Sequence, residues 1–245
     1  MRSTNQDNFY CAGKTLNSNE QGTAGVISGN AITDANCLFA VFDGVGGEEH
    51  GEVASRLAAQ MAGEFDFSEG GSAIREYINQ ANKRIVTYTA ENHLSSCSST
   101  AAMMLFQKKQ GWICNLGDSR IYMLQSGQLQ QLSVDHVWPG YDDKKPPLSQ
   151  CLGIPEAELR LEPYIQKIVP TENALFIICS DGLTDMIEES QIADLSAKGE
   201  KLEETALNLM DASLAAGGTD NITIMLLRLT RNKFSWRQWL TRRFV

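Results

Sequence analysis

The chain has 245 residues, of which 42% are hydrophobic and 21% are charged, a composition typical of a soluble globular protein. Its net charge of −9 argues against nucleic acid as a main partner, because phosphate binding needs clustered Lys and Arg. No apolar run has the length needed to span a bilayer, and the N-terminal residues lack the apolar core of a signal peptide. We therefore expect a cytoplasmic protein without a transmembrane segment.

Six cysteines are scattered singly, without any CxxC pair, and most of them lie in apolar runs. This usage predicts reduced, buried thiols. A catalytic cysteine is the alternative, but the sequence offers no histidine as its partner. The cysteines are Cys11, Cys37, Cys97, Cys114, Cys151 and Cys179.

Apolar runs predict strands, and two pairs of neighbouring runs read as hairpins that turn at Gln110-Gly111 and at Ser126-Gly127. Short turns between neighbouring strands indicate antiparallel sheet. The predicted strands are residues 36–42, 100–107, 111–116, 120–125, 174–179 and 222–229.

Apolar residues at helical spacing predict helices over residues 53–65, 74–85 and 202–214, with a shorter helix after Ser190. The helices are clustered instead of alternating with the strands, which favours an α+β layering over a doubly wound fold. We expect a single domain over residues 1–230, followed by a short tail.

The stretch AVFDGVGGEEHGEVAS places Asp43 at the end of a buried strand and follows it with three glycines. The glycines could form a tight turn and nothing more. Alternatively, they let the backbone wrap around a small charged group that Asp43 binds, with the Gly44 carbonyl turned toward it.

Asp43 is one of five aspartates that lie at the ends of strand-like runs, several of them beside glycine. Each alone reads as turn chemistry, but a sandwich brings strand ends together, and clustered carboxylates repel unless cations hold them. The donors are all oxygens and no histidine has metal-site spacing, so Mg²⁺ or Mn²⁺ fits better than zinc or copper. The five are Asp7, Asp43, Asp118, Asp181 and Asp220.

The residues around these aspartates resemble the metal-dependent Ser/Thr phosphatases of the phosphatase 2C type, in particular the bacterial members. Eight segments follow that family's order through nearly the whole chain, which makes the resemblance highly specific. The segments are RSTNQD, VFDGVGG, SSTAAMML, NLGDSRIYML, LSVDH, SQCLG, CSDGLTDMI and GGTDNITIMLL.

The resemblance implies a four-layer α/β/β/α sandwich of two antiparallel sheets flanked by helices. It also implies a dinuclear Mn²⁺ or Mg²⁺ centre in which Asp43 bridges both ions. Asp181 and Asp220 would complete the shell of the first ion. The Gly44 carbonyl would bind the second, whose waters Asp7 would hold.

Asp118, with Asp181, would hold a weaker third ion, and Arg2 would clamp the substrate phosphate as the catalytic partner of Asp7 and Asp43. The implied activity is hydrolysis of phosphoserine and phosphothreonine in proteins by a metal-activated water, without a phosphoenzyme. We expect a monomer whose substrates are a cognate Ser/Thr kinase or that kinase's targets.

Three departures from the family bear on mechanism. Val45 replaces a histidine that many eukaryotic members carry as a candidate general acid, and bacterial members often lack that histidine too. Gln6 replaces an acidic residue found in some members. Only residues 137–150 separate the Asp-His motif from Cys-Leu-Gly, so the flap found in bacterial members must be short.

The last fifteen residues, 231–245, carry five basic residues and no acidic one, which leaves −14 on the preceding chain. This segment also holds Phe234, Trp236 and Trp239. It reads either as a terminal helix that packs one Trp on the body or as a docking tail for an acidic partner or an anionic membrane.

Two other functions remain open from the sequence. A phosphoprotein-binding pseudophosphatase is disfavoured because all the metal aspartates are present. A phosphatase of small phosphate esters is compatible with the same site, because the site chemistry does not name the leaving group.

Overall fold

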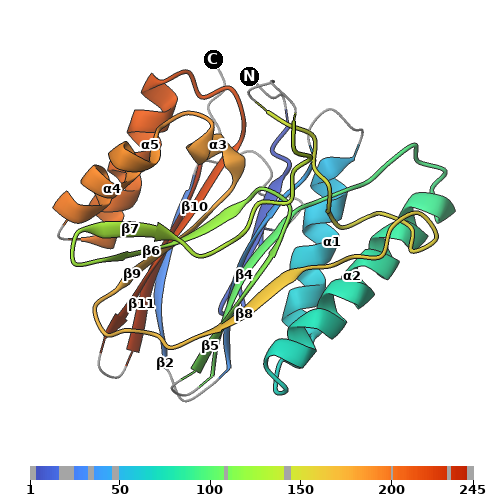
Figure 1. Cartoon of the computed structure of the whole chain (residues 1–245), viewed down its shortest axis with the longest axis horizontal. Helices are drawn as coiled ribbons and strands as arrows, with labels where there is room; N and C mark the ends of the chain where they lie inside the picture. The colour runs from blue at the N-terminus through green and yellow to red at the C-terminus, as the bar shows by residue number, and fades with distance from the viewer. Residues whose placement is uncertain are drawn as a thin grey trace.

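The structure, a computed structural model, describes residues 4–16, 25–32, 36–45, 50–107, 110–140, 145–199, 201–230 and 233–241. Two antiparallel sheets stack face to face, and helices cover the outer face of each (Figure 1). The four-layer α+β sandwich predicted from the sequence is confirmed.

One sheet has five strands in the order β1-β3-β4-β5-β8. Helices α1 (Gly51–Glu64) and α2 (Gly71–Glu91) cover its outer face. Its strands are β1 (Asp7–Cys11), β3 (Cys37–Asp43), β4 (Ala101–Gln107), β5 (Gln110–Leu116) and β8 (Tyr164–Ile168).

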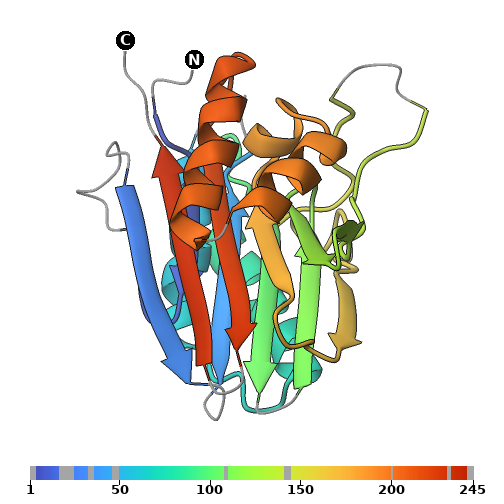
Figure 2. The same cartoon turned by 90° about the vertical axis from the view of Figure 1, so that its left-hand side faces the viewer.

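The other sheet has six strands in the order β2-β11-β10-β9-β6-β7. Its outer face is covered by α3 (Asp181–Thr184), α4 (Glu189–Lys198) and α5 (Leu202–Ala215), as Figure 2 shows. The strands are β2 (Gly25–Ile32), β6 (Arg120–Gln125), β7 (Gln128–Gln131), β9 (Leu175–Cys179), β10 (Ile222–Thr230) and β11 (Lys233–Thr241).

Strand β3 explains why the sequence contains continuous apolar runs in place of alternating ones. Its residues Leu38, Ala40 and Phe42 pack against α1 and α2, whereas Phe39 and Val41 pack against the second sheet. Both faces of the strand are therefore buried. Burial of each large apolar side chain contributes about 1.5–3 kcal/mol, so these central strands dominate the stability of the sandwich.

The predicted elements agree with the structure except in a few places. The turn at Ser126-Gly127 is confirmed, since both residues have positive φ (51° and 78°) between β6 and β7. The turn expected at Gln110-Gly111 is wrong, because these residues begin β5 and pair with β4. The less apolar strands β1, β2 and β8 were not predicted.

All six cysteines are buried, reduced thiols, as expected. Burial raises the pKa of Cys114 and of Cys179 to about 12, which keeps both thiols protonated at neutral pH.

Among the described residues, no helix is long and apolar enough to cross a membrane.

Strand β11 is formed by residues that the sequence assigned to a tail or a terminal helix. It pairs with β10 on one side and with β2 on the other, in the register Trp236 opposite Leu227 and Gly29. The segment thus lies within the sheet, and the expected boundary at residue 230 falls between two paired strands. The remaining tail residues lie outside the described residues.

Removing Phe234–Val245 should therefore destabilise the protein, because it deletes the strand that joins β2 to β10. We expect the melting temperature to fall by more than about 4 °C, since about 1 kcal/mol shifts it by about 2–4 °C in a chain of this size. Hydrolysis of an aryl phosphate and of a phosphoprotein should decline together.

Thermal melts and kinetics on the same truncated protein test this expectation. An unchanged melting temperature with loss of phosphoprotein hydrolysis alone would instead support a docking tail.

Candidate metal centre

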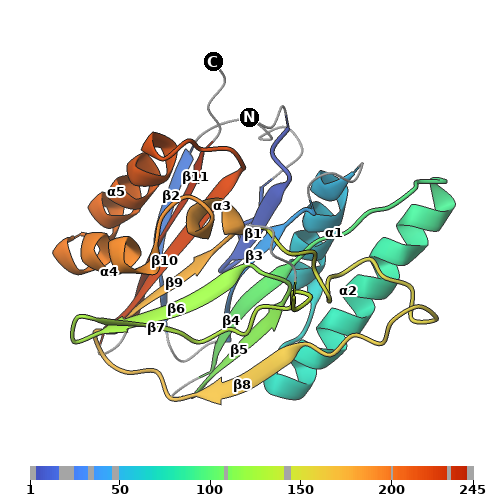
Figure 3. The ribbon, with the colours of Figure 1, turned by 45° about the horizontal axis from the view of Figure 1, so that its top comes forward.

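The strand ends that carry the predicted site residues meet at one end of the sandwich, which Figure 3 brings forward. Asp7 begins β1 and lies directly opposite Asp43, the last residue of β3. Cys179 ends β9 opposite Arg120, which begins β6, and Asp118 and Asp181 lie just beyond these two ends. Antiparallel pairing thereby gathers residues that are far apart in the sequence.

Backbone contacts from three motif segments fix Asp43. The Asp43 carbonyl accepts from Thr100 N (2.8 Å), and Thr100 Oγ1 accepts from Asp43 N (3.1 Å). Gly44 N donates to the carbonyl of Gln6 (3.0 Å). A Cβ at Gly44 would collide with the backbone of Gly51 at the start of α1, so close approach of the two segments requires glycine here.

Asp7 is buried, with 4% of its surface exposed, and its two carboxylate oxygens differ. Oδ2 accepts from Ser180 Oγ (2.8 Å) and Thr223 Oγ1 (2.6 Å), whereas Oδ1 is buried without a hydrogen-bond partner. Burial raises the pKa of Asp7 to about 6, although the bonds from Thr223 and Ser180 oppose the shift. A buried oxygen without a donor is costly, and a water or a hydrated ion would satisfy it.

Asp181 and Asp220 are brought together by the packing of α3 against the start of β10. A Cβ at Gly182 would collide with the carbonyl oxygen of Asn221, so only glycine permits this approach. Asn221 Oδ1 accepts a hydrogen bond from Gln6 N (2.9 Å), and the backbone N–H of Asn221 donates to Asp220 Oδ1 (2.9 Å). The three segments therefore hold one another in register.

Asp118 lies in the turn between β5 and β6, and neighbouring groups fix that turn. Asn115 Nδ2 donates to the carbonyls of Gly117 (2.9 Å) and Val134 (2.8 Å), and Gly117 N donates to His136 Nδ1 (3.3 Å). Burial lowers the pKa of His136, which keeps Nδ1 available as an acceptor. Burial, together with the charge of Asp181, raises the pKa of Asp118 to about 7.

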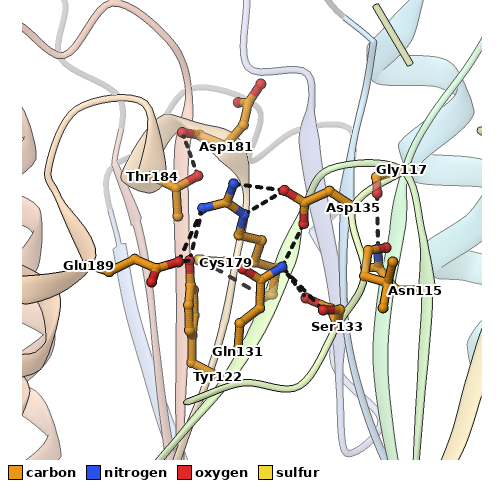
Figure 4. Close-up of polar contacts among 12 residues, drawn as sticks. Asn115, Gly117, Tyr122, Gln131, Ser133, Asp135, Cys179, Asp181, Thr184 and Glu189 are labelled. Atoms are coloured by element: carbon orange, nitrogen blue, oxygen red, sulfur yellow. Dashed lines mark hydrogen bonds and ion pairs between the residues drawn. The ribbon is translucent and has the colours of Figure 1, made fainter. Parts of the chain in front are cut away.

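Arg120, at the start of β6, connects the same turn to the loop after β7 and to α4. Figure 4 shows its partners Asp135, Tyr122 and Glu189. Its guanidinium binds Asp135 Oδ2 through two nitrogens (2.8 and 2.7 Å) and lies 3.1 Å from the Tyr122 hydroxyl and 3.6 Å from Glu189. Gln131 Nε2 donates to the other oxygen of Asp135 (2.7 Å). A two-point Arg–carboxylate pair fixes orientation as well as distance, so this network restrains the chain on both sides of Asp118.

The five predicted aspartates lie close enough to repel one another. Burial raises the pKa of Asp43 well above its usual value, and the charges of Asp7, Asp181, Asp118 and Asp220 raise it further. Opposite charge is needed for all of these groups to ionise together at neutral pH.

Lys145 supplies one such positive charge, which no sequence pattern predicts. It lies in the segment expected to form a short flap, and its Nζ contacts Asp181 Oδ2 and lies 3.5 Å from Asp185 Oδ2 and 3.7 Å from Asp220 Oδ2. Asp185, one turn beyond Asp181, was also missed, and burial raises its pKa. A lysine in a loop carries no sequence signal for its partner.

The residues fit a hard divalent cation. In the described part of the chain, no three His, Cys, Asp or Glu side chains are placed to hold one ion directly. Mg²⁺, however, keeps several waters and takes only one or two carboxylates, so a few carboxylates and intervening waters suffice. The oxygen donors, the repulsion on Asp43 and the unpaired Asp7 Oδ1 all favour such an ion.

The expected site residues divide into those that the structure gathers and those beyond its description. Asp7, Asp43, Gly44, Asp118, Asp181 and Asp220 all lie at the same end of the sandwich. Arg2, Gly46 and Gly47 lie outside the described residues, so their expected roles stay predictions.

Solved structures of bacterial phosphatases share this fold. The serine/threonine phosphatase of S. agalactiae matches with a TM-score of 0.73 and 18% identity, covering 99% of this chain and 95% of that chain. The catalytic domain of the phosphatase PstP, solved in complex with two manganese ions, matches with a TM-score of 0.66 and 21% identity, covering 89% of this chain and 98% of that chain.

Sequence comparisons agree with the structural ones. The serine/threonine phosphatase stp of Listeria welshimeri is 30% identical over an alignment of 217 positions, and the match covers 79% of this chain and 85% of that protein. PstP of Mycobacterium tuberculosis is 26% identical over an alignment of 204 positions, and the match covers 77% of this chain and 40% of that longer protein. A family model described as protein phosphatase 2C matches residues 28–216. The chain belongs to the protein phosphatase 2C family.

Proposed function

We propose that this protein hydrolyses phosphoserine and phosphothreonine in other proteins with the help of bound Mn²⁺ or Mg²⁺. The observation that carries the proposal is the convergence of Asp7, Asp43, Asp118, Asp181 and Asp220 at one end of the sandwich. The relatives named serine/threonine phosphatases, and the manganese-bound PstP structure, support it. A cognate Ser/Thr kinase or its targets are the proposed substrates, and the cytoplasm is the proposed compartment.

Six residues would hold the ions. Asp43 would bridge a pair of ions, with Asp181 and Asp220 on the first and the Gly44 carbonyl on the second. Since no three carboxylates of the described chain are placed to hold one ion directly, at least one of the three on the first ion would act through water or move on binding. Asp7 would act through water, and Asp118 with Asp181 would hold a third ion. When bound, divalent cations supply a water of lowered pKa and neutralise charge on the phosphoryl oxygens.

The chain's own groups orient this chemistry. Ser180 and Thr223 fix one oxygen of Asp7, which leaves Oδ1 to accept a hydrogen bond from a water. Thr100 fixes the backbone of Asp43. Arg2 would bind two phosphate oxygens through its forked guanidinium. Val45 has no titratable group, so protonation of the leaving serine or threonine oxygen falls to water.

The activity is tested with a phosphothreonine peptide, with a sugar phosphate as the competing substrate class. We expect peptide hydrolysis that needs added Mn²⁺ or Mg²⁺ and stops in EDTA, because carboxylates alone cannot activate water or neutralise phosphoryl charge. Phosphate release from both substrates, with and without metal, is the measurement. Full turnover after rigorous metal removal, or a preference for the sugar phosphate, would contradict the proposal.

Replacing Asp43 by Asn removes the charge of the residue proposed to bridge two ions. We expect kcat to fall by at least about a hundredfold and bound metal to decrease, while the fold is retained. Asp211→Asn, an exposed change on α5, is the matched control and should leave both quantities unchanged. Normal turnover and metal content in Asp43→Asn would refute the bridging role.

Asp118→Asn should change stability in a way that depends on pH and metal. The pKa of Asp118 is raised from 3.8 to about 7, so its ionisation in the metal-free fold costs stability, and this cost grows as pH rises through that range. In EDTA the variant should melt at least about 2 °C above the native sequence at about pH 8 and by a smaller margin at about pH 5, since the cost begins above the 3.8 of the unfolded carboxyl and is complete only above about 7.

With saturating Mn²⁺ the advantage at the higher pH should shrink or reverse, because a bound cation favours the ionised carboxylate. Melting curves at both pH values, with and without metal, are the measurement. If Asp118→Asn melts below the native sequence in EDTA at both pH values, the carboxylate is not repelled as described.

A further inference from the structure

The short segment between the Asp-His motif and Cys-Leu-Gly, residues 137–150, places Lys145 beside the candidate metal centre. Its two arms are paired at the base: Val137 bridges Leu148, Trp138 N donates to the Pro147 carbonyl (2.9 Å), and Ser149 N donates to the His136 carbonyl (2.8 Å). Lys145 follows the undescribed residues 141–144 and precedes the paired arm. The base of the loop is thus fixed beside the Asp118 turn, to which His136 also binds.

The Lys145 ammonium is placed among carboxylates from three separate positions. It contacts Asp181 at the start of α3, and it lies near Asp185 just after α3 and Asp220 before β10. The side chain of Asp181 is 9% exposed, whereas that of Lys145 is 49% exposed. The cation therefore covers a buried carboxylate from the solvent side of the site.

We propose that Lys145 and a divalent cation compete for Asp181 and Asp220, so that this lysine sets the metal affinity of the centre. The inference rests on the proposed function, which assigns these two aspartates as metal ligands. It goes further in assigning to the loop a role in metal loading.

The competition follows from the atoms involved. Asp181 Oδ2 contacts the ammonium directly, so an ion that takes this oxygen must displace Lys145 or force it into repulsive contact. Thermodynamic linkage then requires that bound metal weaken the attachment of the loop by the same factor as the loop weakens metal binding. The Lys145 side chain is half exposed, so moving it into water breaks few packing contacts.

Calorimetric titration of the metal-free protein with Mn²⁺ tests the proposal on Lys145→Gln. We expect Mn²⁺ to bind Lys145→Gln about threefold to tenfold more tightly than the native sequence. Each partly exposed ion pair of Lys145 contributes little, but all three are lost together in this variant. Lys83→Gln, an exposed change on α2 with the same loss of charge, is the control and should bind Mn²⁺ like the native sequence.

Hydrogen exchange of peptides from residues 137–150 supplies a second readout that a general charge effect would not move. In the native sequence, Mn²⁺ should increase exchange in this segment, because it releases Lys145. In Lys145→Gln, the segment should exchange faster without metal and should show no further increase with Mn²⁺.

The outcomes separate this inference from the proposed function. Absence of Mn²⁺ binding by the native sequence would overturn the metal centre and the competition with it. Mn²⁺ binding that is equally tight in the native sequence and Lys145→Gln, or a gain shared by Lys83→Gln, would overturn the competition alone. Increased Mn²⁺ affinity without the change in exchange would also overturn it, since displacement of the loop is then absent.

Discussion

The repulsion among buried carboxylates is the constraint on which the rest of this structure depends. Five aspartates share one end of the sandwich, and the pKa of Asp43 is raised by burial and by the other four. Gathering such charges lowers the stability of the fold, because each isolated buried carboxylate costs several kcal/mol. The arrangement is therefore best understood as a site whose stability is completed by cations.

The fold tolerates this repulsion because rigid, well-packed elements hold every carboxylate in place. Apolar strands buried on both faces deliver Asp43 and Asp181, and neutral hydroxyls from Ser180 and Thr223 satisfy one side of Asp7. On the opposite flank, Arg120 and Asp135 brace the turn that carries Asp118. The Arg120–Asp135 pair thus organises this turn without using a site carboxylate, whereas Lys145 contacts Asp181 directly.

The sequence predicted those parts of the structure in which chemistry and local pattern coincide. The long apolar runs of β3, β4 and β9 marked buried strands, and the aspartates at their ends marked the site. The mixed polar composition of β8 hid a strand whose pairing depends on its neighbour β5.

Strand β11 was missed for a related reason. Its basic residues suggested a tail, although polar and apolar residues alternate in KFSWRQ, a pattern typical of a β-strand. The contact of Lys145 with Asp181 could not be predicted, because tertiary packing brings the two residues together and no sequence periodicity indicates it. Gly44 was expected to serve the metal, whereas the structure gives it a further task in its close approach to Gly51.

The pairing of β11 with β2 has a consequence for synthesis on the ribosome. Gly25 and Leu240 lie side by side in the sheet, and the hydrogen bond from Thr223 to Asp7 spans 216 residues of sequence. Contacts between such distant segments are slow to form and need both partners outside the exit tunnel. The carboxylate site therefore cannot assemble before the segment that carries Asp220 and Thr223 has left the tunnel, and a translation product that stops before this segment would lack the site even with the first four motif segments intact.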